Sequence, residues 1–180
     1  MVIATKGAVV LRHAGDDDLV TVDALTIGSY RPIFESYVAM LGADCYEAVR
    51  LEPGLTWEQR KIQQNRRLYD EHPYWLWVLE EEGDVFGVVS FWLVADKSYG
   101  HIDNNCLSAD RVGQGWATFM YRHVLDHFRK RGLRFAHVDT GLDHAHIPAW
   151  RVYEAVGFDR SVPTVEYWQD LSLGNPGSAP

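Results

Sequence analysis

Hydrophobic residues recur along this chain with two different periods. From Ala117 to Phe128, apolar side chains lie three and four residues apart, which predicts a helix with one face packed on a sheet. Val85 to Val94 is instead rich in β-branched and aromatic residues, which favours a strand. Glu80 to Asp84 is a charged turn before it, so Tyr74 to Leu79 is expected to pair with this strand as an antiparallel hairpin.

The rest of the chain also divides into short strands and helices. The expected strands span 9–12, 74–79, 85–94, 101–108, 135–140 and 162–168, and the expected helices span 19–27, 32–41, 57–69, 116–131 and 148–156. A break between the first two helices is expected because Pro32 fits the first turn of a new helix. This order predicts an α/β fold with a mixed sheet and helices on both faces. We expect one domain over 1–172 and a disordered tail over 173–180, which has little to bury.

Composition narrows the class of protein. A hydrophobic fraction of 47% and a charged fraction of 23% are ordinary for a globular protein. The formal net charge of −8 argues against nucleic-acid binding, which requires concentrated Lys and Arg. The start shows no signal peptide and no stretch has the apolar length that spans a membrane, so we expect a cytoplasmic protein without a membrane partner. The two cysteines, Cys45 and Cys106, have no spacing typical of a disulfide framework or zinc site.

A strand-to-helix junction is the main candidate for a binding site. The strand that ends near Ser108 is followed by a polar loop with Gly113 and Gly115, and a helix begins at Trp116. Glycines allow backbone N–H groups to converge and the helix start adds positive potential, so the loop is expected to bind phosphate. The dinucleotide-binding fingerprint needs a third glycine where Thr118 stands, and no P-loop string is present. The glycines alone are equally consistent with a tight turn that binds no ligand.

Two motifs make this junction more specific. VGQGWA over 112–117 is similar to the pattern Gln/Arg-x-x-Gly-x-Gly/Ala, with a departure at Val112. HIPAWRVYEAVGF over 146–158 is similar to Asn-x-x-Ala-x-x-x-Tyr-x-x-x-Gly-Phe, with a departure at His146. In this order, the two motifs resemble those of the GNAT superfamily of acyl-CoA N-acyltransferases. The resemblance covers roughly residues 100–168 and implies that superfamily's fold, with a central, mostly antiparallel sheet.

The resemblance also implies a set of residues that bind coenzyme A, with acetyl-CoA as the acyl donor. In similar proteins, amides of the glycine loop hold the pyrophosphate, and the preceding strand pairs with the pantetheine arm. The corresponding residues here are Cys106, Leu107, Ser108, Val112, Gly113, Gln114, Gly115, Trp116, Ala117, Thr118 and His146. The backbone N–H of Leu107 is expected to face the thioester oxygen. Cys106 is expected to be a small buried thiol rather than a nucleophile.

Three side chains are candidates for catalysis. The resemblance makes Tyr153 the acid that protonates the leaving thiolate, and a purely structural core tyrosine is the alternative. His101 and Asp103 stand where several GNAT enzymes carry a general base, and His titrates near neutrality. Asp103 would orient His101 or bind a cationic acceptor, whereas the alternative is two polar residues at an exposed strand start. Strict alternation would put His101, Asp103, Asn105 and Leu107 on one face of the strand and Ile102, Asn104 and Cys106 on the other.

Other polar groups receive structural interpretations. His123 and His127 are one helical turn apart, but they have no evident third ligand for a metal. Asp143, His144 and His146 share a loop that is better explained as the approach to the second motif, so no metal is predicted. The basic residues Arg60, Lys61, Arg66 and Arg67 of the helix over 57–69 are expected to form a solvated face.

The predicted function is direct transfer of an acetyl group from acetyl-CoA to a primary amine of a small molecule or peptide. A non-catalytic domain that binds or senses acyl-CoA is the alternative, because Val112 and His146 depart from the motifs. Similar proteins often form dimers, so a homodimer is compatible with the resemblance. The identity of the acceptor does not follow from these residues.

Overall fold

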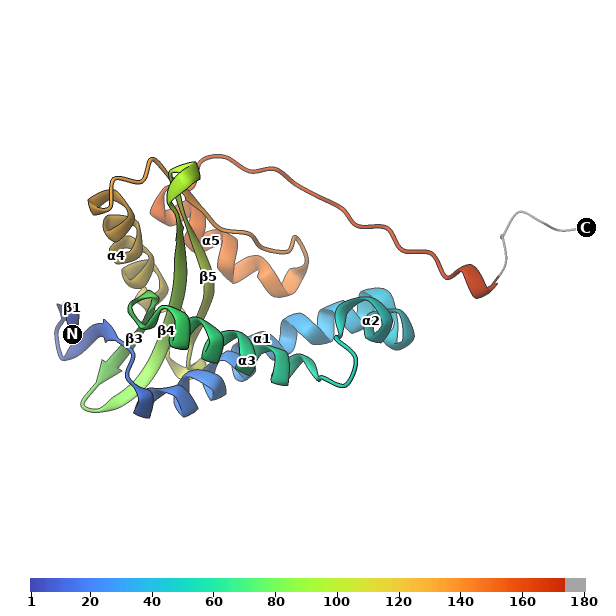
Figure 1. Cartoon of the computed structure of the whole chain (residues 1–180), viewed down its shortest axis with the longest axis horizontal. Helices are drawn as coiled ribbons and strands as arrows, with labels where there is room; N and C mark the ends of the chain where they lie inside the picture. The colour runs from blue at the N-terminus through green and yellow to red at the C-terminus, as the bar shows by residue number, and fades with distance from the viewer. Residues whose placement is uncertain (174–180) are drawn as a thin grey trace, which may run out of the picture.

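The computed structural model describes residues 1–173 and has a six-stranded sheet with helices on both faces, which confirms the predicted fold class (Figure 1). The strands are β1 (Val2–Lys6), β2 (Val9–His13), β3 (Leu76–Glu81), β4 (Asp84–Val94), β5 (Tyr99–Leu107) and β6 (Phe135–His137). The α-helices are α1 (Leu19–Leu41), α2 (Ala43–Arg50), α3 (Trp57–Glu71), α4 (Trp116–Lys130) and α5 (Ile147–Val156). No helix among residues 1–173 combines the length and apolarity needed to cross a bilayer, and the cytoplasmic location stays a prediction.

The strands lie in the sheet in their sequence order, β1 to β6. Every neighbouring pair is antiparallel except β5 and β6, which are parallel and joined through α4. The predicted hairpin is present as β3 and β4, and β1 is an additional edge strand that the hydrophobic pattern did not indicate. The sheet is therefore mostly antiparallel, and its last strand pair is the one that leads into the glycine loop.

Each face of the sheet has its own apolar core. Side chains of α4 and α5 pack on one face with Trp77, Phe91 and Ile102, whereas α1 packs on the other face with Val78, Val88 and Cys106. In β3, Trp77 and Leu79 enter the α4 core and Leu76 and Val78 enter the α1 core, as expected for a sheet covered on both sides.

Helix α1 is one continuous helix of 23 residues, so the predicted break before Pro32 is wrong. Proline removes only the bond to the carbonyl of Gly28, and both residues are exposed, so water can satisfy that carbonyl. Buried residues on both sides of the proline, including Val22 and Phe34, hold the two halves in place. Burial of the two halves thus outweighs the loss of one hydrogen bond.

The predicted final strand over 162–168 is also wrong. This segment follows α5 and runs away from the body of the molecule, and Val162 and Tyr167 are 88% and 91% exposed (Figure 1). A strand needs a partner edge, but β6 has only three residues, and Pro163 has no N–H to donate. The predicted tail over 173–180 lies outside the described residues from 174 onward.

Candidate active site

The candidate site lies where β5 and β6 separate. The two strands pair only from Tyr99 with Phe135 to His101 with His137, and β5 then continues alone to Leu107. The chain after β6 leaves the sheet toward α5 instead of following β5. The second half of β5 therefore has β4 on one side only, and its other edge is available to an extended ligand.

A β-bulge in β5 changes the predicted alternation of side chains. Val89 pairs with Asn105 and Phe91 pairs with Ile102, so two residues of β5 lie opposite the single residue Ser90. Ile102 consequently packs in the α4 core and Cys106 in the α1 core, although strict alternation placed them on the same face. His101 and Asp103 share a face as predicted, whereas their grouping with Leu107 is wrong, because Leu107 packs on the α4 side.

The end of β5 leaves one backbone amide directed away from β4. The N–H of Ser108 donates to the carbonyl of Phe86 across the β4 pair, at 2.8 Å. Since amides alternate in direction along an antiparallel strand, the N–H of Leu107 points toward the open edge of β5. The hydroxyl of Ser29 on α1 donates to the carbonyl of Leu107, at 3.2 Å, and fixes this residue. An amide held in this way is suited to stabilise a developing oxyanion.

Cys106 is not arranged as a nucleophile. Its side chain lies in the α1 core at 2% exposure, and burial raises the pKa of the thiol to about 11. The thiol therefore stays protonated at neutral pH, as predicted for a structural cysteine. Only its backbone lies along the candidate binding edge.

The glycine loop adopts the conformation that the sequence required. Gly113 and Gly115 have φ angles of 80° and 84°, in the left-handed region, and α4 begins immediately afterwards at Trp116. The first N–H groups of a helix have no intrahelical partner. In α4 these groups belong to Trp116, Ala117 and Thr118, which form its first turn. Val112 is 57% exposed beside them. The loop is thus an open set of backbone donors at a helix N-terminus, which suits an anion.

Side-chain contacts hold the loop in position. Gln114 donates from Nε2 to the carbonyl of Asp110, and its Oε1 accepts a hydrogen bond from the indole N–H of Trp116. Trp116 also packs edge-on against Phe86 of β4, with 5.7 Å between ring centroids. Arg111 turns away from the loop and forms an ion pair with Glu81. The role of Gln114 and Trp116 is therefore to support the loop as well as to border it.

Tyr153 lies on α5 with its ring in the α4 core, edge-on to Tyr121 at 5.5 Å between centroids. Burial raises the pKa of its hydroxyl, while neighbouring side chains of Tyr121, Asn105 and Thr140 act in the opposite direction. Asn105 belongs to the half of β5 that pairs with β4 alone, and Thr140 follows β6. The hydroxyl is therefore protonated at neutral pH and lies beside the gap between the two strands, as a proton donor requires.

His101 and Asp103 lie on the α3 side of the same strand. The imidazole of His101 stacks on Trp92 at 3.9 Å, and burial lowers its pKa to about 4 rather than leaving it near neutrality. Burial raises the pKa of Asp103, whose carboxylate accepts a hydrogen bond from Gln64 at 3.0 Å. At neutral pH the imidazole is uncharged and retains a lone pair that can accept a proton.

His146 is engaged by its neighbours at the start of α5. Its Nδ1 is hydrogen-bonded to Asp143, and its ring lies 6.0 Å from that of Tyr37 on α1. Asp143 also accepts a hydrogen bond from Ser36 at 2.8 Å. Burial opposes the ionisation of Asp143, but the hydrogen bonds from Ser36 and His146 prevail and lower its pKa. The structure thus gives His146 a role in fixing the start of α5, and its predicted contact with coenzyme A stays a prediction.

A polar network from α3 was missed by the sequence reasoning. Lys61 donates to Asn104 of β5 at 2.8 Å and lies 4.0 Å above the ring of Tyr30. Burial lowers the pKa of Lys61. Asn65 donates to Thr26 on α1 and accepts from Asn104 on β5, so it connects α3 to both α1 and the sheet. Lys61, Gln64 and Asn65 recur at helical spacing, and this polar stripe was the available indication that α3 faces the site.

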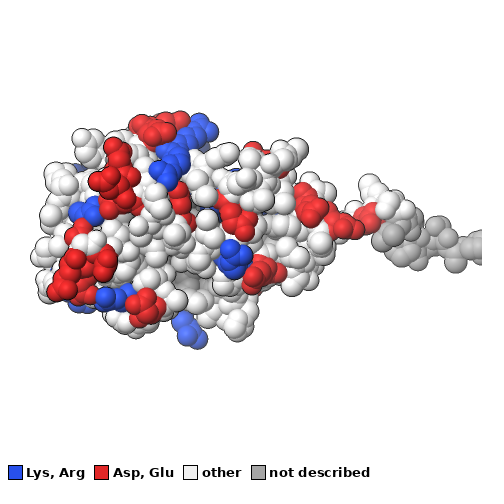
Figure 2. All heavy atoms as spheres, turned by 90° about the horizontal axis from the view of Figure 1, so that it is seen from below, with Lys and Arg blue, Asp and Glu red and all other residues white. Residues whose placement is uncertain are grey.

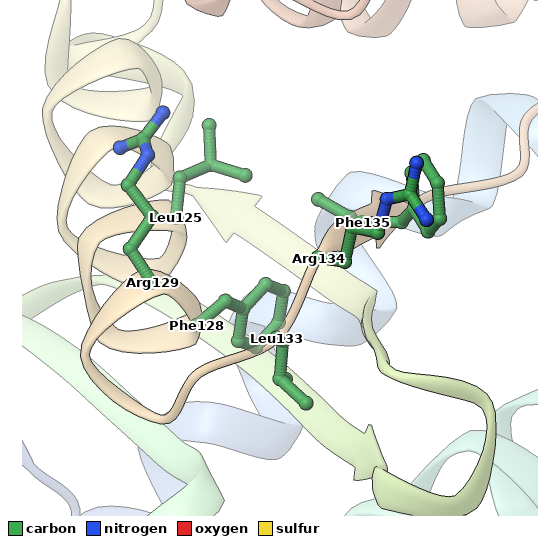
Figure 3. A pocket seen from close by; sticks show the side chains of 7 residues that line it. Leu125, Phe128, Arg129, Leu133, Arg134 and Phe135 are labelled. Atoms are coloured by element: carbon green, nitrogen blue, oxygen red, sulfur yellow. The ribbon is translucent and has the colours of Figure 1, made fainter.

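Two surface cavities lie at β6. The larger, about 330 Å³, is lined by Tyr99, Phe135, Ala136 and His137. The smaller, about 120 Å³, lies between the end of α4 and β6, with the ring of Phe128 directed from α4 toward the segment that carries Leu133 (Figure 3). Both are located beside β6, whose outer edge no strand of residues 1–173 pairs with.

Comparison with known proteins gives a consistent result. A model of the acetyltransferase (GNAT) family matches residues 42–158. The uncharacterized N-acetyltransferase YsnE of Bacillus subtilis (strain 168) is 28% identical over 89 residues, which represent 49% of this chain and 59% of that relative. The chain thus aligns with less than two thirds of that relative's length.

Solved structures share the fold at low sequence identity. A possible acetyltransferase from Clostridium difficile 630 superposes with a TM-score of 0.62 at 11% identity, over 91% of this chain and 99% of that chain. Spermidine N-acetyltransferase from Vibrio cholerae, solved with CoA and spermine, has a TM-score of 0.62 at 17% identity, over 91% and 88%. The family model spans more than half of the sequence and includes both the glycine loop and the Tyr153 motif, and so the chain belongs to the GNAT acetyltransferase family.

Proposed function

We propose that this protein transfers an acetyl group from acetyl-CoA directly to a primary amine. The observation that carries the proposal is the separation of β5 from β6 after His101 and His137. The Leu107 amide, the glycine loop and the Tyr153 hydroxyl all border the region opened by this separation. One extended thioester would thus have its phosphates on the loop and its carbonyl beside the strand end.

The chain's own groups divide the chemistry between them. The N–H of Leu107 donates to the carbonyl oxygen as it becomes anionic. The protonated hydroxyl of Tyr153 supplies a proton to the sulfur as the carbon–sulfur bond breaks. The uncharged imidazole of His101 accepts the proton that the amine loses as its nitrogen bonds to the carbonyl carbon. Asp103 attracts the amine in its cationic form before this step, and the amine releases one proton to the solvent so that it attacks as the neutral species.

The surface charge favours a cationic acceptor. The chain carries a formal net charge of −8, and Asp and Glu side chains predominate over Lys and Arg on the face in Figure 2. A negative potential raises the local concentration of protonated amines and their rate of encounter. The spermine in the Vibrio cholerae enzyme's crystal is one such cation, and polyamines, aminoglycosides and basic peptides are therefore the first acceptors to assay.

The decisive experiment measures release of coenzyme A from acetyl-CoA with these amines, for the wild type and for Tyr153→Phe. The substitution keeps the buried ring and removes only the hydroxyl, so kcat is expected to fall about 100-fold or more while binding of acetyl-CoA changes little. Tyr46→Phe is the matched control, since it removes a buried hydroxyl on α2 that has no hydrogen-bond partner among residues 1–173. Its activity is expected to equal that of the wild type.

Other outcomes separate the alternatives. If the protein binds acetyl-CoA but no amine yields coenzyme A, it is a non-catalytic acyl-CoA sensor, a possibility that the exposed Val112 favours. If it does not bind acetyl-CoA, both functions fail. Equal activity of Tyr153→Phe and wild type would remove the tyrosine from the mechanism while leaving acetyl transfer intact.

A further inference from the structure

The point where β5 and β6 separate also gathers three side chains with metal-binding atoms. His101 on β5 pairs in register with His137 on β6, and Asp139 follows two residues later. One ligand atom from each of the three lies within 4.8 Å of the others. This is the one such group of three in the part of the chain that the structure describes.

We propose that His101, His137 and Asp139 bind one zinc ion, and that the bound ion inhibits acetyl transfer. Imidazole nitrogens and a carboxylate oxygen are ordinary zinc ligands, and three protein ligands leave a fourth position for water. The same set accepts other divalent transition metals, whose affinities follow the usual order for nitrogen and oxygen sites.

The distances are compatible with a metal ion after small side-chain rotations. His101 Nδ1 lies 2.6 Å from His137 Nδ1, whereas the Asp139 carboxylate lies beside the other ring nitrogen, with Oδ1 3.6 Å from His101 Nε2. One ion binds a single nitrogen of each ring, so the ligand set is the one atom per residue that lies within 4.8 Å of the others, and the exposed partners must rotate toward the ion. In a tetrahedral zinc site with bonds of about 2.0–2.2 Å, ligand atoms are about 3.3–3.6 Å apart. His137 is exposed and the Asp139 side chain is 78% exposed, so both can rotate toward the ion.

His101 provides the fixed part of the site. It is only 7% exposed, and its ring stacks on Trp92 with an angle of 20° between the planes. A ligand whose orientation is already restricted loses less entropy on binding. The other histidine groups lack this arrangement, because His146 is engaged with Asp143, and His123 and His127 have no third ligand within such reach among residues 1–173.

Inhibition follows from the position of His101, and this part rests on the proposed function. The imidazole that accepts the proton of the amine would have a ring nitrogen bound to zinc. Asp139 and His137 would be drawn over the same region. The proton of the amine would then have no acceptor at His101, and turnover would fall.

Metal binding is tested directly and without turnover. Purified, metal-free protein is titrated with Zn²⁺ by calorimetry, and with Co²⁺ followed by its visible absorption, which reports four-coordinate geometry. We expect one ion per chain and, for His137→Ala or Asp139→Ala, a rise in Kd of about 10-fold or more. His144→Ala removes another exposed histidine outside the cluster, and it should bind zinc as the wild type does. Binding below one ion per chain, or equal affinities in all four proteins, would overturn the site.

Inhibition is tested by quantifying the acetylated amine by mass spectrometry, because the thiol of coenzyme A itself binds zinc. Zinc should reduce turnover of the wild type and of His144→Ala, and EDTA should restore it. His137→Ala should need a zinc concentration at least about 10-fold higher for the same inhibition. Stoichiometric zinc binding with unchanged turnover would overturn the inhibition. A protein with no transferase activity would refute the proposed function, while the titrations would still decide the metal site.

Discussion

The substitution Gly115→Ala tests whether the shape of the glycine loop is what binds coenzyme A. Gly115 has a φ of 84° at the start of α4, and an added Cβ would meet no atom within 4 Å. The cost is therefore not a clash but the left-handed backbone, which disfavours an L-residue by about 1–2 kcal/mol. Because the loop is exposed, we expect it to relax to a negative φ in the free protein, and the amides then no longer converge.

Binding must restore the left-handed conformation, so the Kd for coenzyme A should rise by about 5–30-fold, the equivalent of 1–2 kcal/mol. Gly7→Ala is the matched control. Gly7 has a φ of 63° in the turn between β1 and β2 and equally open surroundings. There, strand pairing holds the turn, so the free energy of unfolding should fall by about 1–2 kcal/mol while the Kd stays unchanged.

Calorimetric titration with coenzyme A and urea unfolding, applied to both variants, separate the two effects. A Kd for Gly115→Ala within twofold of the wild-type value would show that the left-handed residue before α4 is not used for binding. A similar loss of affinity in Gly7→Ala would show that the effect is a general consequence of destabilisation.

Three further predictions concern stability. Gly100→Ala should lower the free energy of unfolding by about 1–3 kcal/mol, because its Cβ would lie 2.5 Å from three ring atoms of Phe128, and adding Phe128→Leu should recover part of the loss in urea unfolding. Hydrogen bonding to Arg12 lowers the pKa of Asp18, so the contribution of this ion pair to the free energy of unfolding is lost as the pH falls below about 4. The free energy of unfolding of Asp18→Asn should therefore depend less on pH in acid, and identical pH profiles for the variant and the wild type would contradict this. Thr56→Ala should cost about 1 kcal/mol by removing the cap of α3, whereas Thr56→Ser should not.

The local pattern of the chain determined much of the site. Glycines at 113 and 115, followed by an amphipathic helix, predicted a loop whose backbone N–H groups converge at a helix start, and the structure has left-handed glycines immediately before α4. The β3–β4 hairpin was predicted equally well. These features depend on backbone dihedral angles and on contacts a few residues apart, which adjacent residue types largely decide.

Features that depend on long-range packing were not determined by the sequence alone. The predicted break at Pro32 and the predicted strand at 162–168 both followed from local preference. Burial of both halves keeps α1 continuous, and the short edge of β6 offers no partner for a further strand. The buried polar contacts of Lys61 arise because α3 packs beside β5.

The bulge in β5 is the clearest case for the candidate site itself. One extra residue opposite Ser90 reverses the faces of every side chain after it, and no residue type marks its position in advance. The meeting of His101 with His137 likewise required the parallel register of two strands separated by a whole helix. The sequence by itself thus determined the left-handed glycine loop before α4 and the helix that carries Tyr153, because their geometry is local. Only the tertiary structure decided which side chains meet beside the open edge of β5, because that depends on how distant strands and helices pack together.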